Sequence, residues 1–330
     1  MKDTIKQLVE AYGPAGREEQ VAEYLTEVMQ TLVDKVYTDE LGNVIAVKQG
    51  PAAAKKVMLA AHMDEIGVII TDIDDNGFLR FSNIGGVSPF TLIGQRVRFA
   101  NGTIGVFGRE KLDDIKDLKL NKMYIDIGVT SREEAEGKVG IGDSAVYHRE
   151  FTLQGQRVVA KSLDNRISCA ILIEVARRLE NSPHEVYLVF TAQEEVGLRG
   201  ARTAAYALDP DYGIAVDVTA TGDTPEAPRM AVSLGKGAAI KVKDSSVVSH
   251  PLVKNLLVNT AEAQGIPYQM EVLERGGTDA GSIHLTRSGI PTGAVSIPCR
   301  YIHTPSEMVD LGDVENCIQL LVGVLEGPLP

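Results

Sequence analysis

The chain opens with the apolar spacing of helices and continues with short apolar runs. Between residues 4 and 33, apolar side chains recur at three- and four-residue intervals, and Gly13–Gly16 interrupts them. This pattern predicts two amphipathic helices. Two runs, Val44–Val47 and Val57–Ala61, follow, and the second is continuously apolar, as a strand covered on both faces would be.

A different pattern begins near residue 66 and lasts to about residue 157. Short alternating segments replace the helical spacing, as in Arg96–Phe99, where arginines alternate with Val97 and Phe99. Turn signals recur at Asp75–Gly77 and Asn101–Gly102. We therefore predict that residues 66–157 form a small β-rich inserted domain.

Helix and strand patterns alternate again after this segment. A helix is predicted from Asp164 to Leu179, followed by strands that end at Ala192 and at Val216. Later segments repeat the alternation: a helix at 252–264, a strand at 291–297 and a helix at 314–325. The fold class predicted is α/β, with a mostly parallel central sheet covered by helices on both faces. Residues 1–65 and 158–330 would form this larger, discontinuous domain.

Composition and charge narrow the possible partners. The 330 residues are 44% hydrophobic and 24% charged, as in an ordinary globular protein. The net charge is -12 and no cluster of Lys and Arg offers a stripe for phosphate backbones, so nucleic acid is not expected as a partner. The N-terminus has no apolar signal region, and no apolar stretch is long enough for a membrane span. We therefore expect a cytoplasmic protein without a membrane partner.

Ionisable residues of metal-ligand type follow the predicted strands. They are His62, the pair Glu194 and Glu195, Asp217 and His303, and Asp164 stands at a predicted helix start. Because the carboxyl ends of parallel strands share one edge, these side chains would converge. Singly, each has a structural explanation, such as a solvated acidic loop, a satisfied core histidine or a helix cap. The sequence pattern alone is compatible with two interpretations: a metal site, or a set of separate structural residues.

The residue types indicate which metals would suit such a site. If one glutamate of the adjacent pair serves as a base, two imidazoles and three carboxylates remain as ligands. This set, without paired cysteines, fits zinc, cobalt or manganese and exceeds what one tetrahedral ion uses. Two divalent ions with a shared carboxylate would lower the pKa of a bridging water and polarise a carbonyl oxygen. Asp64 lies two positions after His62, on the same face of an extended segment, so we predict that it orients the imidazole.

Six motifs, in this order, resemble those of the M42 metalloaminopeptidases, the group of glutamyl aminopeptidases, tetrahedral aminopeptidases and so-called cellulases M. They are His62–Gly67, Ser162–Arg166, Gln193–Gly197, Val216–Asp217, Gly276–Ala280 and His303–Pro305. The resemblance covers essentially the whole chain. It implies the fold of the dinuclear zinc or cobalt exopeptidases, with an insert that mediates subunit contacts.

The resemblance also implies a role for each site residue. It makes Asp164 the bridge between two metals, Glu194 the general base and Asp64 the residue that orients His62. The remaining ligands would be His62 and Asp217 on one metal, and Glu195 and His303 on the other. Gly277 and Asp279 would lie near the substrate pocket. Short peptides are the substrates that the resemblance implies, and dimers and tetrahedral dodecamers are the assemblies.

Three other functions remain as alternatives. A deacylase or carboxypeptidase of the same clan would not require a free α-amino group. A glycoside hydrolase would use two carboxyl groups without a metal, which leaves His62 and His303 unexplained, and the chain has no Trp to stack on sugar rings. A non-catalytic scaffold would have no need of Glu194.

Overall fold

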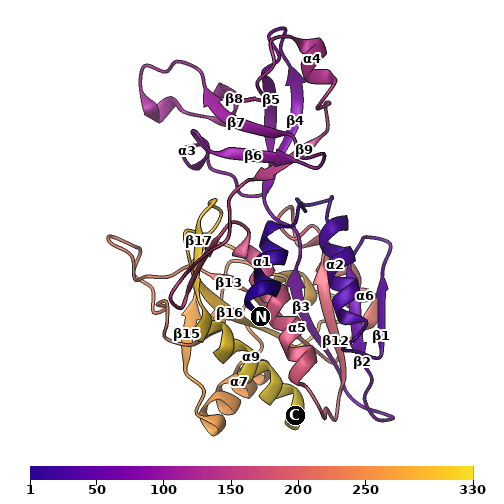
Figure 1. The fold of residues 1–330 in the computed structure, drawn as a ribbon. Helices are drawn as coiled ribbons and strands as arrows, with labels where there is room; N and C mark the ends of the chain where they lie inside the picture. The colour runs from indigo at the N-terminus through magenta and orange to yellow at the C-terminus, as the bar shows by residue number, and fades with distance from the viewer. Residues whose placement is uncertain (330) are drawn as a thin grey trace.

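The computed structural model describes residues 1–329, which form two lobes (Figure 1). The larger lobe contains both ends of the chain and a mixed sheet, and the smaller lobe is a closed barrel set on top of it in this view. The chain enters the barrel after residue 66 and leaves it after Tyr147.

The large sheet has eleven strands, and the four at its centre are parallel. These four, in spatial order, are β12 (Glu185–Thr191), β3 (Lys56–His62), β13 (Tyr212–Thr219) and β16 (Thr292–Arg300). On one side β2 (Val44–Lys48) and β1 (Lys35–Thr38) continue the sheet antiparallel. On the other side the order is β17 (Glu307–Asp310), β11 (Arg157–Ala160) and β10 (Thr152–Gln154), also antiparallel. The prediction of a mostly parallel sheet therefore holds for the centre, whereas the sheet as a whole is mixed.

Two further strands branch from the centre of the sheet. β14 (Ala238–Lys243) pairs antiparallel with β16, and β15 (Tyr268–Val272) pairs parallel with β14. Neither strand was predicted, because their apolar runs are short and are interrupted by Lys241, Gln269 and Glu271.

Helices cover both faces of the sheet, as the apolar runs predict. Alternate residues of β3 show this: Val57 and Leu59 pack in one apolar cluster, whereas Met58 and Ala60 pack in another. The first cluster is closed by α1 (Lys2–Glu10), α2 (Glu19–Met29), α5 (Leu163–Arg178), α7 (Pro251–Gln264) and α9 (Leu311–Glu326). The second is closed by α6 (Arg199–Leu208) and the short α8 (Ala280–Ile283). Among residues 1–329, no helix combines the length and the apolar character needed to cross a membrane.

The smaller lobe is a barrel of six antiparallel strands around its own apolar core. Its strands, in spatial order, are β4 (Gly67–Ile73), β5 (Leu79–Ile84), β8 (Met123–Asp126), β7 (Ile104–Arg109), β6 (Arg96–Phe99) and β9 (Ser144–Tyr147). The alternation in β6 places Val97 and Phe99 inside. Short helical turns join the strands: α3 (Pro89–Leu92), η1 (Ile115–Asp117), η2 (Leu120–Lys122) and α4 (Arg132–Glu136). β10 pairs with β11 and so belongs to the large sheet.

Candidate active site

The predicted site residues of five separate segments meet at the carboxyl edge of the central strands. His62 ends β3 and lies opposite Thr191, the last residue of β12, from which the chain continues to Glu194 and Glu195. Asp217 lies within β13 and His303 follows β16. A cavity of about 490 Å³ opens here, and its ionisable side chains include His62, Asp164, Glu194, Glu195, Asp217 and His303. Five distant segments therefore contribute to one site, as the topology of parallel strands predicts.

Asp164 lies between two imidazoles. Its Oδ1 is 3.1 Å from Nε2 of His62, and its Oδ2 is 3.2 Å from Nε2 of His303. Burial raises the pKa of the Asp164 carboxyl, but the hydrogen bonds from His303 and His62 outweigh burial and hold the pKa well below its usual value. Asp164 is therefore an ionised carboxylate whose two oxygens point to different sides of the site.

Two groups of side chains in this cavity are arranged so that each could hold a metal ion. In each group the potential ligand atoms lie within 4.8 Å of one another; the groups are His62, Asp164 and Glu195, and His62, Glu194 and Asp217. His303 joins the first group, because its Nε2 is 3.3 Å from Oε2 of Glu195. The other oxygen of Glu195, Oε1, is buried and has no hydrogen-bond partner in the part of the chain that the structure describes. An unpartnered carboxylate oxygen among imidazoles fits a divalent cation.

The site concentrates negative charge away from water. Burial, together with the charges of Asp217 and Asp279, raises the pKa of Glu194 well above its usual value. Burial likewise raises the pKa of Asp217, and the charge of Asp164 adds to this shift. Like charges in a buried site disfavour one another's ionised forms unless cations compensate them. The four carboxylates that line the cavity would balance two divalent ions.

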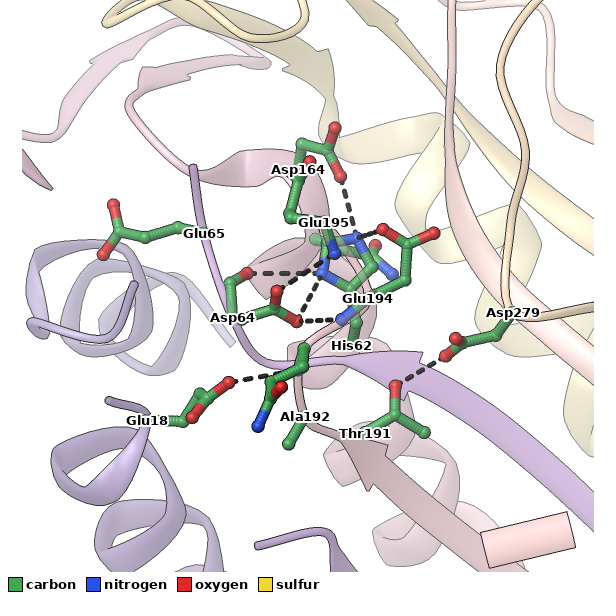
Figure 2. A network of polar contacts seen from close by, with 12 residues as sticks. Glu18, His62, Asp64, Glu65, Asp164, Thr191, Ala192, Glu194, Glu195 and Asp279 are labelled. Carbon is green, nitrogen blue, oxygen red and sulfur yellow. Dashed lines mark hydrogen bonds and ion pairs between the residues drawn. The ribbon is translucent and has the colours of Figure 1, made fainter. Parts of the chain in front are cut away.

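Asp64 binds the backbone of the Glu194–Glu195 pair. Its carboxylate is fully buried and accepts hydrogen bonds from the N–H groups of Glu194 and Glu195, at 2.9 and 3.1 Å. The same carboxylate lies 3.4 Å from Nδ1 of His62, on the ring side away from Asp164 (Figure 2). Asp64 thus positions three side chains of the site, whereas the sequence suggested only His62.

Glu307 is a site residue that the sequence did not reveal. It is 2% exposed, and its two carboxylate oxygens accept the N–H groups of Asp164 and His303, each at 2.8 Å. Burial and the nearby charge of Asp164 raise the pKa of Glu307 well above its usual value. Its only sequence signal was its position, four residues after His303, at the start of a short strand.

Glu18 has a comparable role on the other side of the site, and the sequence analysis missed it too. Its carboxylate accepts N–H groups from Gly16 and from Gln193, the residue that precedes Glu194, at 2.8 and 3.0 Å. Gln193 has a positive φ of 57°, and His303 has one of 63°. Such a backbone is costly for residues other than glycine and persists where surrounding contacts hold it. Glu18 and Glu307 provide those contacts.

The barrel lobe reaches the site at Gly86. A Cβ atom at this position would lie 2.4 Å from Nδ1 of His303, so a larger residue would displace the imidazole. The small lobe therefore shapes the site, although it contributes none of the clustered carboxylates.

The two predicted pocket residues differ in position. Gly277 lines the cavity. Asp279 lies deeper: it is 2% exposed, and its Oδ2 accepts a hydrogen bond from Oγ1 of Thr191 at 2.5 Å (Figure 2). Burial raises the pKa of Asp279 to about 6, and its Oδ1 has no hydrogen-bond partner. The structure thus places Asp279 behind the carboxylate cluster and Gly277 at its surface.

Comparisons with known proteins show the family to which the chain is similar. The model of the M42 glutamyl aminopeptidase family matches residues 42–320 of the chain. A putative aminopeptidase of Acetivibrio thermocellus is 54% identical over 323 residues, which are 98% of this chain and 97% of that protein. The lysyl aminopeptidase of Pyrococcus furiosus is 38% identical over 339 residues, which are 98% of this chain and 96% of that protein.

Solved structures share the whole fold. An aminopeptidase from the archaeon Desulfurococcus kamchatkensis superposes with a TM-score of 0.95 at 40% identity, and the match covers 99% of this chain and 95% of that one. The TET1 peptidase of Pyrococcus horikoshii, described as assembling into a tetrahedron or a large octahedral shell, gives a TM-score of 0.88 at 32% identity and covers 99% of both chains. The similarity therefore extends over both lobes.

Proposed function

The chain belongs to the M42 glutamyl aminopeptidase family, and we propose that it is a metal-dependent aminopeptidase that removes N-terminal residues from short peptides. One observation carries the proposal: the two oxygens of Asp164 face His62 and His303 in a cavity that Glu194, Glu195 and Asp217 complete. Neither a scaffold nor a metal-free glycosidase needs a carboxylate shared between two imidazoles.

We propose that the site holds two divalent ions, zinc or cobalt, with manganese as a third candidate. Asp164 would be the shared ligand, with His62 and Asp217 on one side and Glu195 and His303 on the other. When bound, such a pair lowers the pKa of water and polarises the carbonyl of the peptide bond. Asp64 and Glu307 would keep the ligands oriented through their hydrogen bonds.

Glu194 would be the general base. Its side chain lines the cavity, and its Oε2 lies 3.8 Å from Nε2 of His62. The carboxylate would accept a proton from the attacking water and pass it to the nitrogen of the leaving amine. The hydrogen bond from the Glu194 N–H to Asp64 keeps the backbone of this base in place, so the carboxylate needs no large movement to reach the proton.

The peptide would bind in the part of the cavity that is not charged. Leu198, Leu273 and Ile302 line it together with Gly277. Apolar walls exclude water from the peptide bond, and Gly277 leaves room for a substrate side chain. We propose Gly277 as a pocket residue in direct contact and Asp279 as a residue behind the wall.

We further propose that copies of the chain associate through the inserted domain, residues 66–157, into dimers and a tetrahedral dodecamer. Large apolar side chains are exposed on the barrel lobe, namely Phe90, Ile93, Ile104, Val106, Ile115 and Ile141. Apolar groups exposed together mark association surfaces. The catalytic domain would be residues 1–65 and 158–330. We place the protein in the cytoplasm, since Cys169, Cys299 and Cys317 are free thiols.

Hydrolysis of aminoacyl chromogenic amides, each beside its N-acetylated twin, tests the proposed activity. The enzyme is assayed after chelation and again after zinc or cobalt is restored. We expect activity that returns with metal and only on substrates with a free amine, because the site processes N-termini. Cleavage of the acetylated twins would favour the deacylase of the same clan, and full activity after chelation would refute the two-metal site.

A further inference from the structure

A second cavity lies where the barrel lobe meets the N-terminal helix. Its volume is about 370 Å³, and it shares no lining residue with the active-site cavity. Helix α1 contributes Lys6 and Glu10, and β6 contributes Arg98. The rest of the wall is His148–Phe151, which returns from the barrel to the large lobe, and Lys161, which follows β11. This junction cavity therefore touches both lobes.

The charge of the junction cavity is opposite to that of the whole protein. Four cations line it, Lys6, Arg98, Arg149 and Lys161, against the two carboxylates of Glu10 and Glu150. The local balance is thus positive by two charges in a chain whose net charge is -12. Like charges gathered in one concave site repel one another unless an anion compensates them.

Ion pairs do not neutralise the cations that face the cavity. Within residues 1–329, no ion pair joins two of the residues that line it. The half-buried Arg98 donates to a main-chain oxygen, that of Glu10, at 2.7 Å, and the Glu10 carboxylate accepts the N–H of Phe151 at 3.4 Å. Lys6 and Arg149 are exposed, and neither forms an ion pair with any residue between 1 and 329. Three cationic groups therefore retain free donors toward the cavity.

The rear wall adds positive potential without offering a donor. Lys161 is 3% exposed, and its ammonium is bound by both oxygens of Glu65, at 2.7 and 2.9 Å, and by Ser162. Arg166 also contacts Glu65, at 3.3 Å, so this buried group remains positive by one charge. At the cavity wall, burial and the charges of Arg96 and Arg98 lower the pKa of His148. The positive potential of the cavity therefore extends to the imidazole of His148.

We propose that the junction cavity binds a small dianionic oxyanion of the phosphate class, held by Arg98, Lys6 and Arg149. A dianion matches the surplus of two positive charges. The guanidinium of Arg98 can donate two parallel hydrogen bonds to such a group, and the ammonium of Lys6 adds a point charge. Because Lys6 belongs to α1 and Arg98 to the barrel, the bound anion would link the two lobes. This site is independent of the proposed peptidase chemistry.

Isothermal titration calorimetry of the metal-loaded enzyme with inorganic phosphate tests the proposal. The variant is Lys6→Gln with Arg149→Gln, since both side chains are exposed and their loss leaves the fold intact. The matched control is Lys2→Gln with Arg109→Gln, which removes two exposed cations outside the cavity. We expect phosphate to bind the wild type and the control alike and the variant at least about tenfold more weakly, because two of three charge-assisted contacts are lost. Hydrolysis of aminoacyl amides should be equal in all three proteins.

Two further readouts separate the junction cavity from other sources of binding. Phosphate that binds at the metal centre would be common to the three proteins, so only the difference between variant and control counts. A rise of a few degrees in melting temperature with phosphate is expected for wild type and control, and not for the variant. Equal phosphate binding by variant and control would overturn the proposal. Succinate, a dicarboxylate, should bind more weakly than phosphate, and tighter succinate binding would overturn the assignment to the phosphate class.

Discussion

The two lobes differ in what they bury and in how densely they expose large apolar side chains. In the barrel, from Gly67 to Tyr147, Ser144 is the one polar residue that is buried. The large lobe buries many, among them His62, Asp64, Asp164 and Glu307. Both lobes expose large apolar side chains, but six of them lie within the short segment 67–147, among them Ile104 and Val106 of strand β7. The interior of the barrel is thus almost entirely apolar, and its outer surface also carries exposed apolar side chains.

This contrast indicates that the two lobes have different functions. Burying carboxylates costs free energy unless hydrogen bonds and cations compensate them, and this arrangement is found where chemistry requires it. Exposing apolar side chains also costs free energy, which association with a second surface recovers. We infer that the large lobe is built for catalysis and the barrel for assembly.

Charge placed on the barrel surface is expected to have the largest effect on the assembly. Ile104→Asp combined with Val106→Asp should dissociate the assembly, because two carboxylates would be buried without partners in the contact. Light scattering after size-exclusion chromatography measures the mass, which should fall several-fold. The control is Asn76→Asp with Lys116→Gln, which changes the net charge equally at exposed polar positions. A variant that keeps the mass of the control would show that the barrel does not mediate assembly.

A moderate effect is expected from Glu307, which supports the site without lining the cavity. In Glu307→Gln the amide nitrogen would face one of the two N–H groups that the carboxylate now accepts, from Asp164 and His303. Both proposed ligands would shift, so we expect about 10- to 100-fold lower kcat and a weaker affinity for metal. The exposed Glu326→Gln is the matched control. Equal metal dissociation constants for the two variants would refute a positioning role.

Glu307 also shows where prediction from the sequence ends. His62, Glu194, Asp217 and His303 each stand at or just after the end of an apolar run in the sequence, so the topology of parallel strands brings them together. Glu307 acts through main-chain N–H groups, and no residue type or spacing reveals such contacts. Asp64 is intermediate: its spacing predicted proximity to His62, but its hydrogen bonds to Glu194 and Glu195 depend on a loop with a positive φ at Gln193.

The fold, too, was predictable only in part. Long periodic segments predicted the helices and the central strands, for example Leu163–Arg178, expected at 164–179. The closed barrel and the branch formed by β14 and β15 depend on pairing between distant segments. Local alternation shows that such strands exist, but it does not specify their neighbours.

The smallest effect concerns a buried carboxylate that lies outside the catalytic cavity. Asp313 accepts the N–H groups of Gly235 and Gly237, and burial raises its pKa from 3.8 to about 6. The folded protein therefore binds more protons than the unfolded chain between these values, so the free energy of unfolding falls as the pH rises through this range. We expect the wild type to lose about 1–2 kcal/mol relative to Asp313→Asn between about pH 4 and pH 6.

Denaturant titrations of both metal-loaded proteins at several pH values measure this difference. Because the metal site is the same in both proteins, its own pH dependence cancels in the comparison. A difference in stability that stays constant with pH would show that Asp313 does not titrate in this range.

The most direct measurement is the turnover of Glu194→Gln with its metal content determined on the same sample. Glutamine keeps the shape of the side chain but cannot accept the proton, whereas the proposed ligands His62, Asp164, Glu195, Asp217 and His303 are unchanged. We predict full metal occupancy with turnover reduced by about three to five orders of magnitude, since the base and its proton transfers are lost. A metal-replete variant that retains substantial activity would contradict the assignment of this cavity as the catalytic centre with Glu194 as its base.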